Sequence, residues 1–403
     1  MNETLESEFA HLKSLGLVID LTRGKPGADQ LDLSNAILSM DTPTHASSGL
    51  DIRNYGEPLG IMEARELGAS LLSSPVEQTL VGEQSSLLLI YQLILANYLF
   101  GLKTPWSKQE NLKFICPVPG FDRHFRLLED FGIEVLTLPL NGAGIDIQEF
   151  KDLLSQHNNI KGLIAVPRHS NPSGDIYTDE NILSLMEAGK AYSDEFLFIF
   201  DHAYLVHDFS ECASQTPTWE LAVKAGAQRQ TAVLSSFSKV TFGGGGLSFA
   251  TAGKELFELL VKQRAGMIVC PDKANQLRHV LFLKNKEGIE RHMKNHAALI
   301  KPKFEAAFHV LDAIPEELGS YHKPTGGYFI SFDTHKPIAA RTIELCKEAG
   351  VLITPAGSTF PGFQDPKDSN IRLAPTFINL EDLKLAMQVF ITALKIADQE
   401  LSS

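Results

Sequence analysis

Apolar residues in the central part of the chain follow two alternating patterns. Short apolar runs predict six β-strands, at residues 112–116, 134–138, 162–166, 197–200, 231–235 and 247–251. Between the runs, apolar residues recur at helical spacing over residues 121–130, 147–155, 178–193 and 220–225. Strands that alternate with helices form mostly parallel sheets covered on both faces, so the pattern predicts an α/β fold with a mostly parallel sheet.

The N-terminal part of the chain has a less regular pattern. Helical spacing predicts an entry helix at residues 2–16. Turn signals such as Gly24-Lys25-Pro26 and Pro43 then predict an irregular arm over residues 17–50. A further apolar segment predicts a helix at residues 84–99.

Beyond about residue 255 the predicted strands become sparse. The pattern predicts a long helical stretch to about residue 310 with a break at Pro271, and then a strand at 327–332, a helix at 337–348, a strand at 351–354 and a last helix from 380 to about 401. This α+β pattern suits a second, smaller domain, and a chain of 403 residues exceeds what one hydrophobic core usually supports. We therefore expect a large domain of residues 51–300 and a small domain formed by residues 1–50 and 301–403.

Composition and charge narrow the classes of function. The formal net charge of −13 argues against nucleic acid as the main partner, because phosphate-binding surfaces need clustered Lys and Arg. The four cysteines are far apart and form no C-x-x-C motif, so we expect no disulfide framework, no metal site and a reducing compartment. The acidic N-terminus does not resemble a signal peptide, and the most apolar stretch, residues 87–100, is too short and too polar to span a bilayer. These features predict a cytoplasmic protein without a membrane segment.

A lysine flanked by serines is the first candidate for chemistry. The segment Ser235-Ser236-Phe237-Ser238-Lys239 follows a predicted strand and precedes the glycine run 243–246. A lysine just past a strand end in this kind of sheet faces the ligand crevice, where burial lowers its pKa and lets the amine form an imine with a carbonyl. The alternative is a solvated lysine on a surface loop, which this segment alone favours.

An aspartate at the end of a buried strand is the second candidate. Asp201-His202-Ala203-Tyr204 follows the apolar run 196–200. A carboxylate in this position is costly unless a positive group meets it, and the protonated pyridine nitrogen of a cofactor is such a group. Tyr204 would then hydrogen-bond the same cofactor. An aspartate that caps the following turn is an equally good interpretation of this segment alone.

Two further segments place polar residues among apolar ones. The segment Asn171-Pro172-Ser173-Gly174 marks a turn at a strand end. The side-chain amide of Asn171 could reach a ligand, although an ordinary turn is the better interpretation of this segment alone. Arg372 lies between Ile371 and Leu373, where it could form a bidentate pair with a carboxylate. The alternative for Arg372 is an edge-strand arginine or a structural salt bridge.

The order of these residues resembles the fold-type I aminotransferases, which use pyridoxal 5′-phosphate (PLP) and have the aspartate aminotransferase fold. Asn171, Asp201, Tyr204, Lys239 and Arg372 match that family's signature residues in type, order and approximate spacing. Other matching segments, in chain order, are Tyr55-Gly56 with Gly60 and Arg65, residues 82–86, Pro119-Gly120-Phe121, Ser236, residues 326–329, and Pro355 with Gly357 and Phe360. Residues 21–26 and 119–125 resemble one branch, the bacterial type Ic aspartate aminotransferases.

The resemblance implies roles around the cofactor ring. Lys239 would hold PLP as a Schiff base and move a proton during the reaction, and Asp201 would pair with the pyridine nitrogen. Tyr204 and Asn171 would bond the phenolic oxygen, while Phe121 would stack on the ring.

The resemblance also places the substrate and the phosphate. Arg372 would bind the substrate α-carboxylate, helped by Asn171 and the backbone at Gly24. The phosphate would lie at a helix start and beside the lysine loop, against Gln84, Ser85, Ser86, Ser236 and Ser238. Tyr55 would reach the phosphate from a partner subunit, which implies a homodimer.

One position departs from the family pattern. Many members carry Gly-Leu-Arg after the lysine loop, and that arginine binds the phosphate. Here the segment is Gly246-Leu247-Ser248, so Ser248 stands in its place. Other groups must then balance the phosphate charge.

The implied reaction is ping-pong transamination between an amino acid and a 2-oxo acid, with aspartate and 2-oxoglutarate as the expected pair. A dicarboxylate needs a second cation, and the sequence does not rank the candidates Arg23, Lys25, Arg53, Arg123, His124 and Arg168. One alternative is β-elimination or decarboxylation, because the same lysine and aspartate serve those reactions. Another is a non-catalytic effector-sensing module of a DNA-binding regulator. Such a module follows a basic helix-turn-helix segment, whereas about 50 irregular residues precede Tyr55 here.

Overall fold

A computed structural model describes residues 3–402 and contains one large sheet at its centre. The strand order is β2-β8-β7-β6-β5-β3-β4. The bounds are β2 Thr79–Gly82, β3 Lys113–Val118, β4 Glu134–Pro139, β5 Ile160–Ala165, β6 Leu197–Asp201, β7 Thr231–Ser236 and β8 Ser248–Ala252. Strands β3 to β7 pair in parallel, whereas β8 runs antiparallel to both β7 and β2. The predicted mostly parallel sheet and its six strands are confirmed. The sequence pattern missed β2, whose four residues are too few to show a period.

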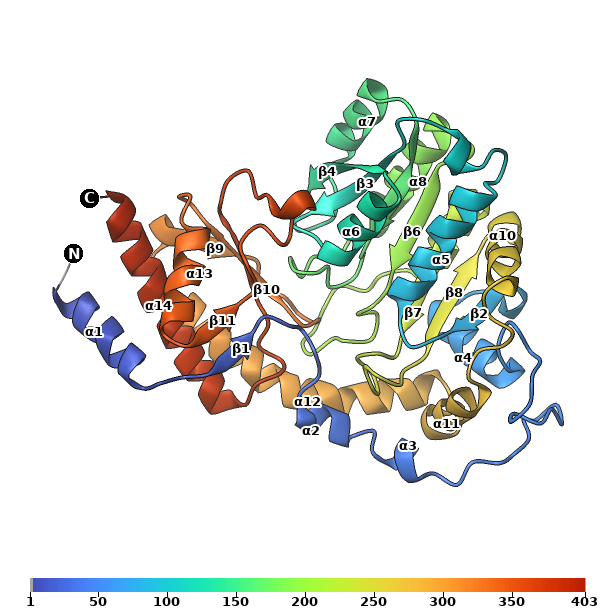
Figure 1. The fold of residues 1–403 in the computed structure, drawn as a ribbon, viewed down its shortest axis with the longest axis horizontal. Helices are drawn as coiled ribbons and strands as arrows, with labels where there is room; N and C mark the ends of the chain where they lie inside the picture. Colours follow the sequence, from blue (N-terminus) through green and yellow to red (C-terminus); the bar gives the residue numbers. More distant parts are fainter. Residues whose placement is uncertain (1–2, 403) are drawn as a thin grey trace.

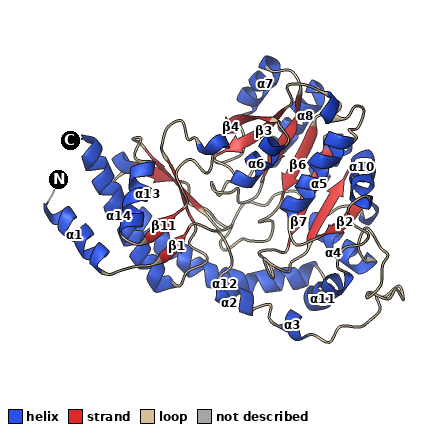
Figure 2. Cartoon of the chain, in the orientation of Figure 1, coloured by secondary structure: helices blue, strands red, loops and turns tan. Residues whose placement is uncertain are grey.

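Helices cover both faces of this sheet, as Figures 1 and 2 show. Their bounds are α4 Met62–Leu72, α5 Ser86–Leu99, α6 Asp122–Asp130, α7 Ile147–Gln156, α8 Asp179–Tyr192, α9 Thr218–Lys224 and α10 Lys254–Ala265. The strands are buried on both sides, so alternate residues of one strand enter different cores: Ile164 packs in the core with α5 and α10, and Leu163 in the core with α7 and α8. The chain therefore needs apolar residues at consecutive positions in each central strand.

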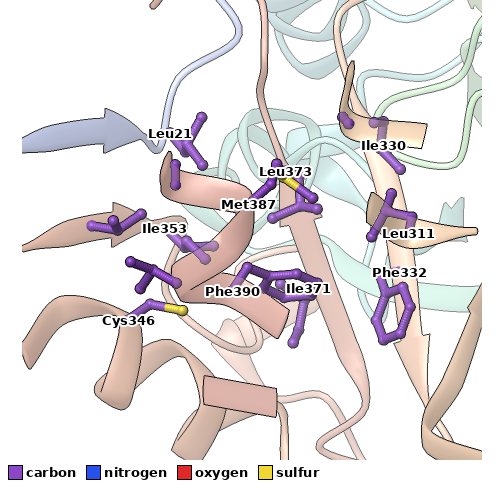
Figure 3. Packing of buried hydrophobic residues seen from close by; sticks show 14 of the residues in the cluster. Leu21, Leu311, Ile330, Phe332, Cys346, Ile353, Ile371, Leu373, Met387 and Phe390 are labelled. Atoms are coloured by element: carbon purple, nitrogen blue, oxygen red, sulfur yellow. The ribbon is translucent and has the colours of Figure 1, made fainter. Parts of the chain in front are cut away.

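A second layer of structure lies to one side of the large sheet (Figure 1). Strand β10 Ile330–Thr334 pairs antiparallel with β9 Gly319–Tyr321 and β12 Asn370–Leu373, and β1 Ile19–Leu21 pairs in parallel with β11 Val351–Ile353. Helices α1 Glu3–Ser14, α13 Ala339–Glu348 and α14 Leu380–Ser402 pack around these strands. Figure 3 shows their shared core, in which Ile371, Phe332 and Phe390 are fully enclosed. The predicted domain boundaries near residues 50 and 300 stay a prediction.

The segments between the two sheets differ in detail from the predicted pattern. The arm, predicted to be irregular, contains β1 and two short helices, α2 Ala28–Asp32 and α3 Ala36–Ser39. The long helical stretch contains α11 Lys273–Leu283 and α12 Lys286–Leu311 after α10. The second break was not predicted; there Lys284 has a positive φ of 68°, and the Asn285 side chain accepts a hydrogen bond from Gly288 N.

Short 3₁₀ turns complete the described chain, at Val76–Gln78, Trp106–Lys108, Gln228–Gln230, Glu316–Leu318 and Pro361–Phe363. Among residues 3–402, no helix combines the length and the apolar character needed to cross a membrane. Helix α12 runs below the large sheet and the second layer and links them (Figure 1). The carboxyl ends of β3, β5, β6 and β7 open toward the second layer, where ligands of such sheets bind.

Candidate active site

A cavity of about 700 Å³ lies at these carboxyl ends and is also lined by residues of the arm and of the second layer. Every residue predicted for the site lines it except Tyr55: Gly24, Gln84, Ser85, Ser86, Phe121, Asn171, Asp201, Tyr204, Ser236, Ser238, Lys239 and Arg372. The fold therefore brings together residues that are spread over almost 350 positions of the chain.

Asp201 is the last residue of β6 and is 3% exposed. Its Oδ2 lies 3.3 Å from Nε2 of His124 on α6, and its Oδ1 has no hydrogen-bond partner. Burial alone would raise the pKa of this carboxyl. Hydrogen bonds from His124 and Ser86 and the charges of His124 and Lys239 together outweigh burial, so the pKa lies below its usual value. The site thus holds a buried carboxylate with one oxygen available for a positively charged group.

Lys239 follows β7 in a loop whose first residue, Phe237, is completely buried. Its Nζ lies 4.8 Å from the centroid of the Tyr204 ring. Burial lowers the pKa of the Lys239 ammonium, and the nearby Asp201 only partly offsets this effect. A larger share of the amine is therefore neutral, which is the form that attacks a carbonyl or accepts a proton.

The start of α5 offers unpaired backbone N–H groups to the cavity. Ser85 occupies the position before the helix, and its side chain does not cap the helix. The Ser238 hydroxyl donates to the Gln84 carbonyl and, over 3.2 Å, to Ser236 Oγ. Free N–H groups with neighbouring hydroxyls form a site that suits an anion such as a phosphate.

Ser248, in the place of the family's phosphate-binding arginine, does not line the cavity. Its hydroxyl donates to the Glu83 carbonyl over 2.8 Å and so fastens the loop that precedes α5. Space is short at this point, because a Cβ on Gly82 would approach Ser248 Oγ to 2.4 Å. A buried arginine, Arg264, lies below the same loop and is engaged by the Glu83 carboxylate at 3.3 Å.

Arg372 on β12 is 9% exposed and forms no ion pair within the described chain. Its guanidinium donates over 3.3–3.4 Å to Thr354 Oγ1, Asn171 Oδ1 and the Thr22 carbonyl, all neutral acceptors. The guanidinium also lies 4.9 Å from the centroid of the Phe329 ring. Burial lowers the pKa of Arg372, yet an arginine remains charged. The cavity therefore contains a guanidinium that neutral acceptors hold in place and that has no carboxylate partner.

Gly24 is required by close packing between the arm and the small sheet. A Cβ at this position would lie 2.2 Å from the Phe329 ring, which no side chain tolerates. The glycine therefore lets the arm backbone approach the ring on which Arg372 lies. Gly24 and Arg372 both line the cavity, and the Arg372 guanidinium also donates to the carbonyl of Thr22 in the same arm.

The structure sorts the six candidate cations for a second carboxylate. Arg53 and Arg168 each bond an aspartate through two nitrogens, Asp51 and Asp208 respectively, and the buried His124 contacts Asp201. The remaining three, Arg23, Lys25 and Arg123, line the cavity. Lys25 lies over the Phe377 ring at 3.8 Å, and Arg123 is 3.7 Å from Asp122.

Sequence reasoning missed several residues that shape the site. Thr22, Thr354 and Phe329 contact Arg372, and His124 contacts Asp201, but none was assigned that contact. His124 lies in the segment 119–125 that was noticed, so its position after a strand was an available signal. Tyr55 is 75% exposed and does not line the cavity of its own chain.

Comparison with known proteins shows the family to which the chain belongs. A family model described as aspartate amino-transferase matches residues 1–403. The chain belongs to the aspartate aminotransferase family. A relative from Corynebacterium glutamicum named aspartate aminotransferase is 38% identical over 407 residues, which cover 99% of this chain and 94% of the relative.

Solved structures of the family have the same fold. The crystal structure of an aspartate transaminase from Corynebacterium glutamicum matches with a TM-score of 0.94 and 37% identity, covering 100% of this chain and 96% of that one. An α-aminoadipate aminotransferase from Thermus thermophilus, complexed with N-(5′-phosphopyridoxyl)-L-leucine, matches with a TM-score of 0.78 and 20% identity over 99% of this chain and 98% of that one. At this lower identity the likeness shows the fold alone.

Proposed function

We propose that the protein is a PLP-dependent aminotransferase that moves the amino group of aspartate to 2-oxoglutarate. The observation that carries the proposal is the arrangement around one cavity of a desolvated lysine amine, a buried carboxylate with a free oxygen and a buried arginine without an anion. Family membership and the aspartate aminotransferase relative support the same activity.

The residues present fit PLP. The unpartnered Asp201 Oδ1 matches a protonated pyridine nitrogen, and Lys239 lies where its amine can meet the aldehyde. The N–H groups at the start of α5, with Ser236 and Ser238, match a phosphate. When bound, PLP supplies a carbonyl carbon for exchange of the amino group and a cationic ring that withdraws electrons.

The side chains around the cavity would have separate functions. Asp201, held ionised by His124, keeps a positive charge favourable at the far end of the ring. Burial raises the pKa of the Tyr204 hydroxyl well above its usual value, so this hydroxyl stays protonated and can donate a hydrogen bond. Arg372 would fix the α-carboxylate of the amino acid, and the amine of Lys239, whose pKa burial lowers, would accept the proton of the α-carbon and donate it to the carbonyl carbon that PLP supplies.

The choice of a dicarboxylate rests on the three cations at the cavity that lack a bidentate acidic partner. We propose that Arg23, Lys25 and Arg123 provide the group that binds the distal carboxylate of aspartate. Such a contact is a charge-assisted hydrogen bond, which is stronger than a neutral one. β-Elimination, decarboxylation and the regulator module are not favoured, because two relatives that are 38% identical and cover 99% of this chain have aminotransferase names.

Titration with amino acids tests the reaction and the substrate together. Aspartate should remove the visible absorbance band of the purified holoprotein, and 2-oxoglutarate should restore it, with oxaloacetate as the product. Alanine, which lacks the distal carboxylate, should require about 10- to 100-fold higher concentrations. Release of ammonia, or loss of the band with an aromatic amino acid but not with aspartate, would contradict the proposal.

Neutral variants identify the cation. Among Arg23→Gln, Lys25→Gln and Arg123→Gln, at least one should remove most of the preference for aspartate over alanine while leaving alanine turnover unchanged. Arg53→Gln is the matched control, because Arg53 is bound to Asp51 and does not line the cavity. A preference for aspartate that survives in all three variants would move the distal carboxylate site elsewhere.

We also propose that the protein is a homodimer in which Tyr55 contacts the phosphate bound to the other subunit. The exposed apolar residues Leu38, Tyr55, Met267 and Val269 support this, because they belong to segments that contact or precede α11. Lys273 at the start of that helix donates to the Gly56 carbonyl over 3.0 Å, next to Tyr55. Exposed apolar side chains grouped in this way are typical of an interface.

Mixed dimers test the contribution of Tyr55. Tyr55→Ala alone should weaken PLP binding, and mixing it with Lys239→Arg should restore tight binding at one site per dimer. In that mixed dimer the chain with an intact Lys239 receives Tyr55 from its partner. A monomer in sedimentation, or no recovery on mixing, would refute the shared site.

A further inference from the structure

A buried polar cluster lies directly behind the Lys239 loop and does not line the cavity. We call it the lysine-support cluster; its members are Gln30, Ser34, His292, His296 and Tyr328, all of which are at most 8% exposed. They come from α2 and the turn after it, from α12 and from the segment before β10. Buried polar groups are costly unless bonded, so the contacts of this cluster are strongly directional.

Two members of the cluster hold the backbone at the lysine itself. The Tyr328 hydroxyl donates to the Lys239 carbonyl over 3.3 Å, and His292 Nε2 lies 2.8 Å from the Val240 carbonyl. These are consecutive peptide groups. The Lys239 carbonyl belongs to the peptide group attached to the Lys239 Cα, and the Val240 carbonyl belongs to the next one, so the two contacts together hold the main chain from which the lysine side chain starts.

The other contacts connect this backbone to the arm. Gln30 Nε2 donates to the Tyr328 hydroxyl over 2.8 Å and lies 3.2 Å from His296 Nδ1. Gln30 Oε1 accepts a hydrogen bond of 3.1 Å from Gly27 N, so all the polar atoms of this side chain are engaged. His296 Nε2 in turn lies 3.2 Å from His292 Nε2. Figure 1 shows α2 beside α12.

The same arm reaches the substrate end of the cavity. Gly24 precedes Gln30 by six residues and packs on Phe329, the neighbour of Tyr328. Phe329 also contacts the Arg372 guanidinium. A shift of the arm when an α-carboxylate binds would therefore act on Gln30 and Tyr328 as well as on Gly24.

The cluster is uncharged at neutral pH. Burial lowers the pKa of His292, and burial together with His292 lowers the pKa of His296 to about 4. Burial raises the pKa of the Tyr328 hydroxyl, with Gln30 partly opposing the effect, so the hydroxyl remains a donor. The cluster can therefore connect the arm to the Lys239 backbone through the geometry of its hydrogen bonds and not through charge.

We propose that Gln30, His292, His296 and Tyr328 are positioning residues that tie the orientation of Lys239 to the placement of the arm that carries Gly24. The inference rests on the proposed role of Lys239 as the cofactor lysine and adds a set of residues outside the cavity to it. Removing one hydrogen bond of the lysine-support cluster would leave the Lys239 amine in the cavity but change its direction. Misplacement by about 1 Å can slow a reaction by about 100-fold.

Two nearly isosteric variants test the proposal in the holoprotein: Tyr328→Phe and Gln30→Met. Each should lower the maximal rate of the half-reaction with aspartate by about 10-fold or more, with less than about a 3-fold change in the half-saturating concentration. Each should also shift the pH at which the visible cofactor band changes. The double variant should be little worse than either single variant, because both act through the same hydrogen bond.

Tyr321→Phe is the matched control. It also removes a tyrosine hydroxyl that bonds another group, Asp312, but it lies on β9 away from the lysine loop. It should leave both the rate and the pH midpoint unchanged. If the two test variants lower only the unfolding temperature of the apoprotein and move neither the midpoint nor the maximal rate, the cluster is merely structural and the inference is wrong. A wild-type protein without a visible band would instead refute the proposed function itself.

Discussion

Replacing Lys239 with arginine is expected to lower transaminase turnover by about 10⁴-fold or more. General acid–base catalysis alone contributes about 10²- to 10⁴-fold, and Lys239 is also the proposed covalent partner of the cofactor. Arginine keeps the positive charge near Asp201 but stays protonated, so it can neither attack a carbonyl nor accept a proton. Steady-state turnover of aspartate with 2-oxoglutarate measures the loss.

Lys161→Arg is the matched control for that variant. Lys161 lies on β5, is 9% exposed and has a pKa that burial also lowers, but it does not line the cavity. The control should retain activity and its visible band, while Lys239→Arg should bind PLP without forming the wild-type band. Turnover within about 10-fold of wild type in Lys239→Arg would exclude the proposed mechanism.

Replacing Arg372 with leucine is expected to reduce kcat/KM for aspartate by about 10²- to 10⁴-fold. A bidentate pair with a carboxylate contains two hydrogen bonds to charged groups, each worth about 1.5–3 kcal/mol, and about 1.4 kcal/mol corresponds to a factor of ten. Thr354 and Asn171, which now accept from the guanidinium, would be left without that donor. Most of the loss should be in the apparent affinity for both the amino acid and the 2-oxo acid.

Arg372→Lys separates charge from geometry. Lysine keeps a cation at this end of the cavity but cannot form the planar fork, so it should recover only part of the loss. Both variants should bind PLP normally, since we propose that Arg372 binds the substrate α-carboxylate and not the cofactor phosphate. An unchanged kcat/KM in Arg372→Leu would show that another group binds the α-carboxylate.

The large sheet could be predicted from the sequence because two independent signals locate its central strands. Each central strand contains a short apolar run, and each is bounded by a helix with clear spacing, so β5, β6 and β7 were located within two residues. The four-residue β2 and the short elements of the arm carry no such signal. Their structure depends on pairing with β8 and β11, which are remote in the sequence.

The candidate site was predictable where a motif marks it and not where tertiary packing decides. Lys239, Asp201 and Arg372 were found because their types and order match a family, and the structure places them around one cavity. Which cations face that cavity could not be predicted, because it depends on whether an acid such as Asp51 or Asp208 lies nearby in the fold. The lysine-support cluster is of the same kind, since its residues belong to segments far apart in the chain and share no local motif.

The central claim is a covalent link between PLP and the amine of residue 239. Borohydride reduction of the holoprotein, followed by digestion and mass spectrometry, tests it directly. We predict a single phosphopyridoxyl modification on the peptide that contains Lys239, absent when the protein is saturated with aspartate before reduction. A modification on another lysine, or none on a protein that carries the visible band, would contradict this account.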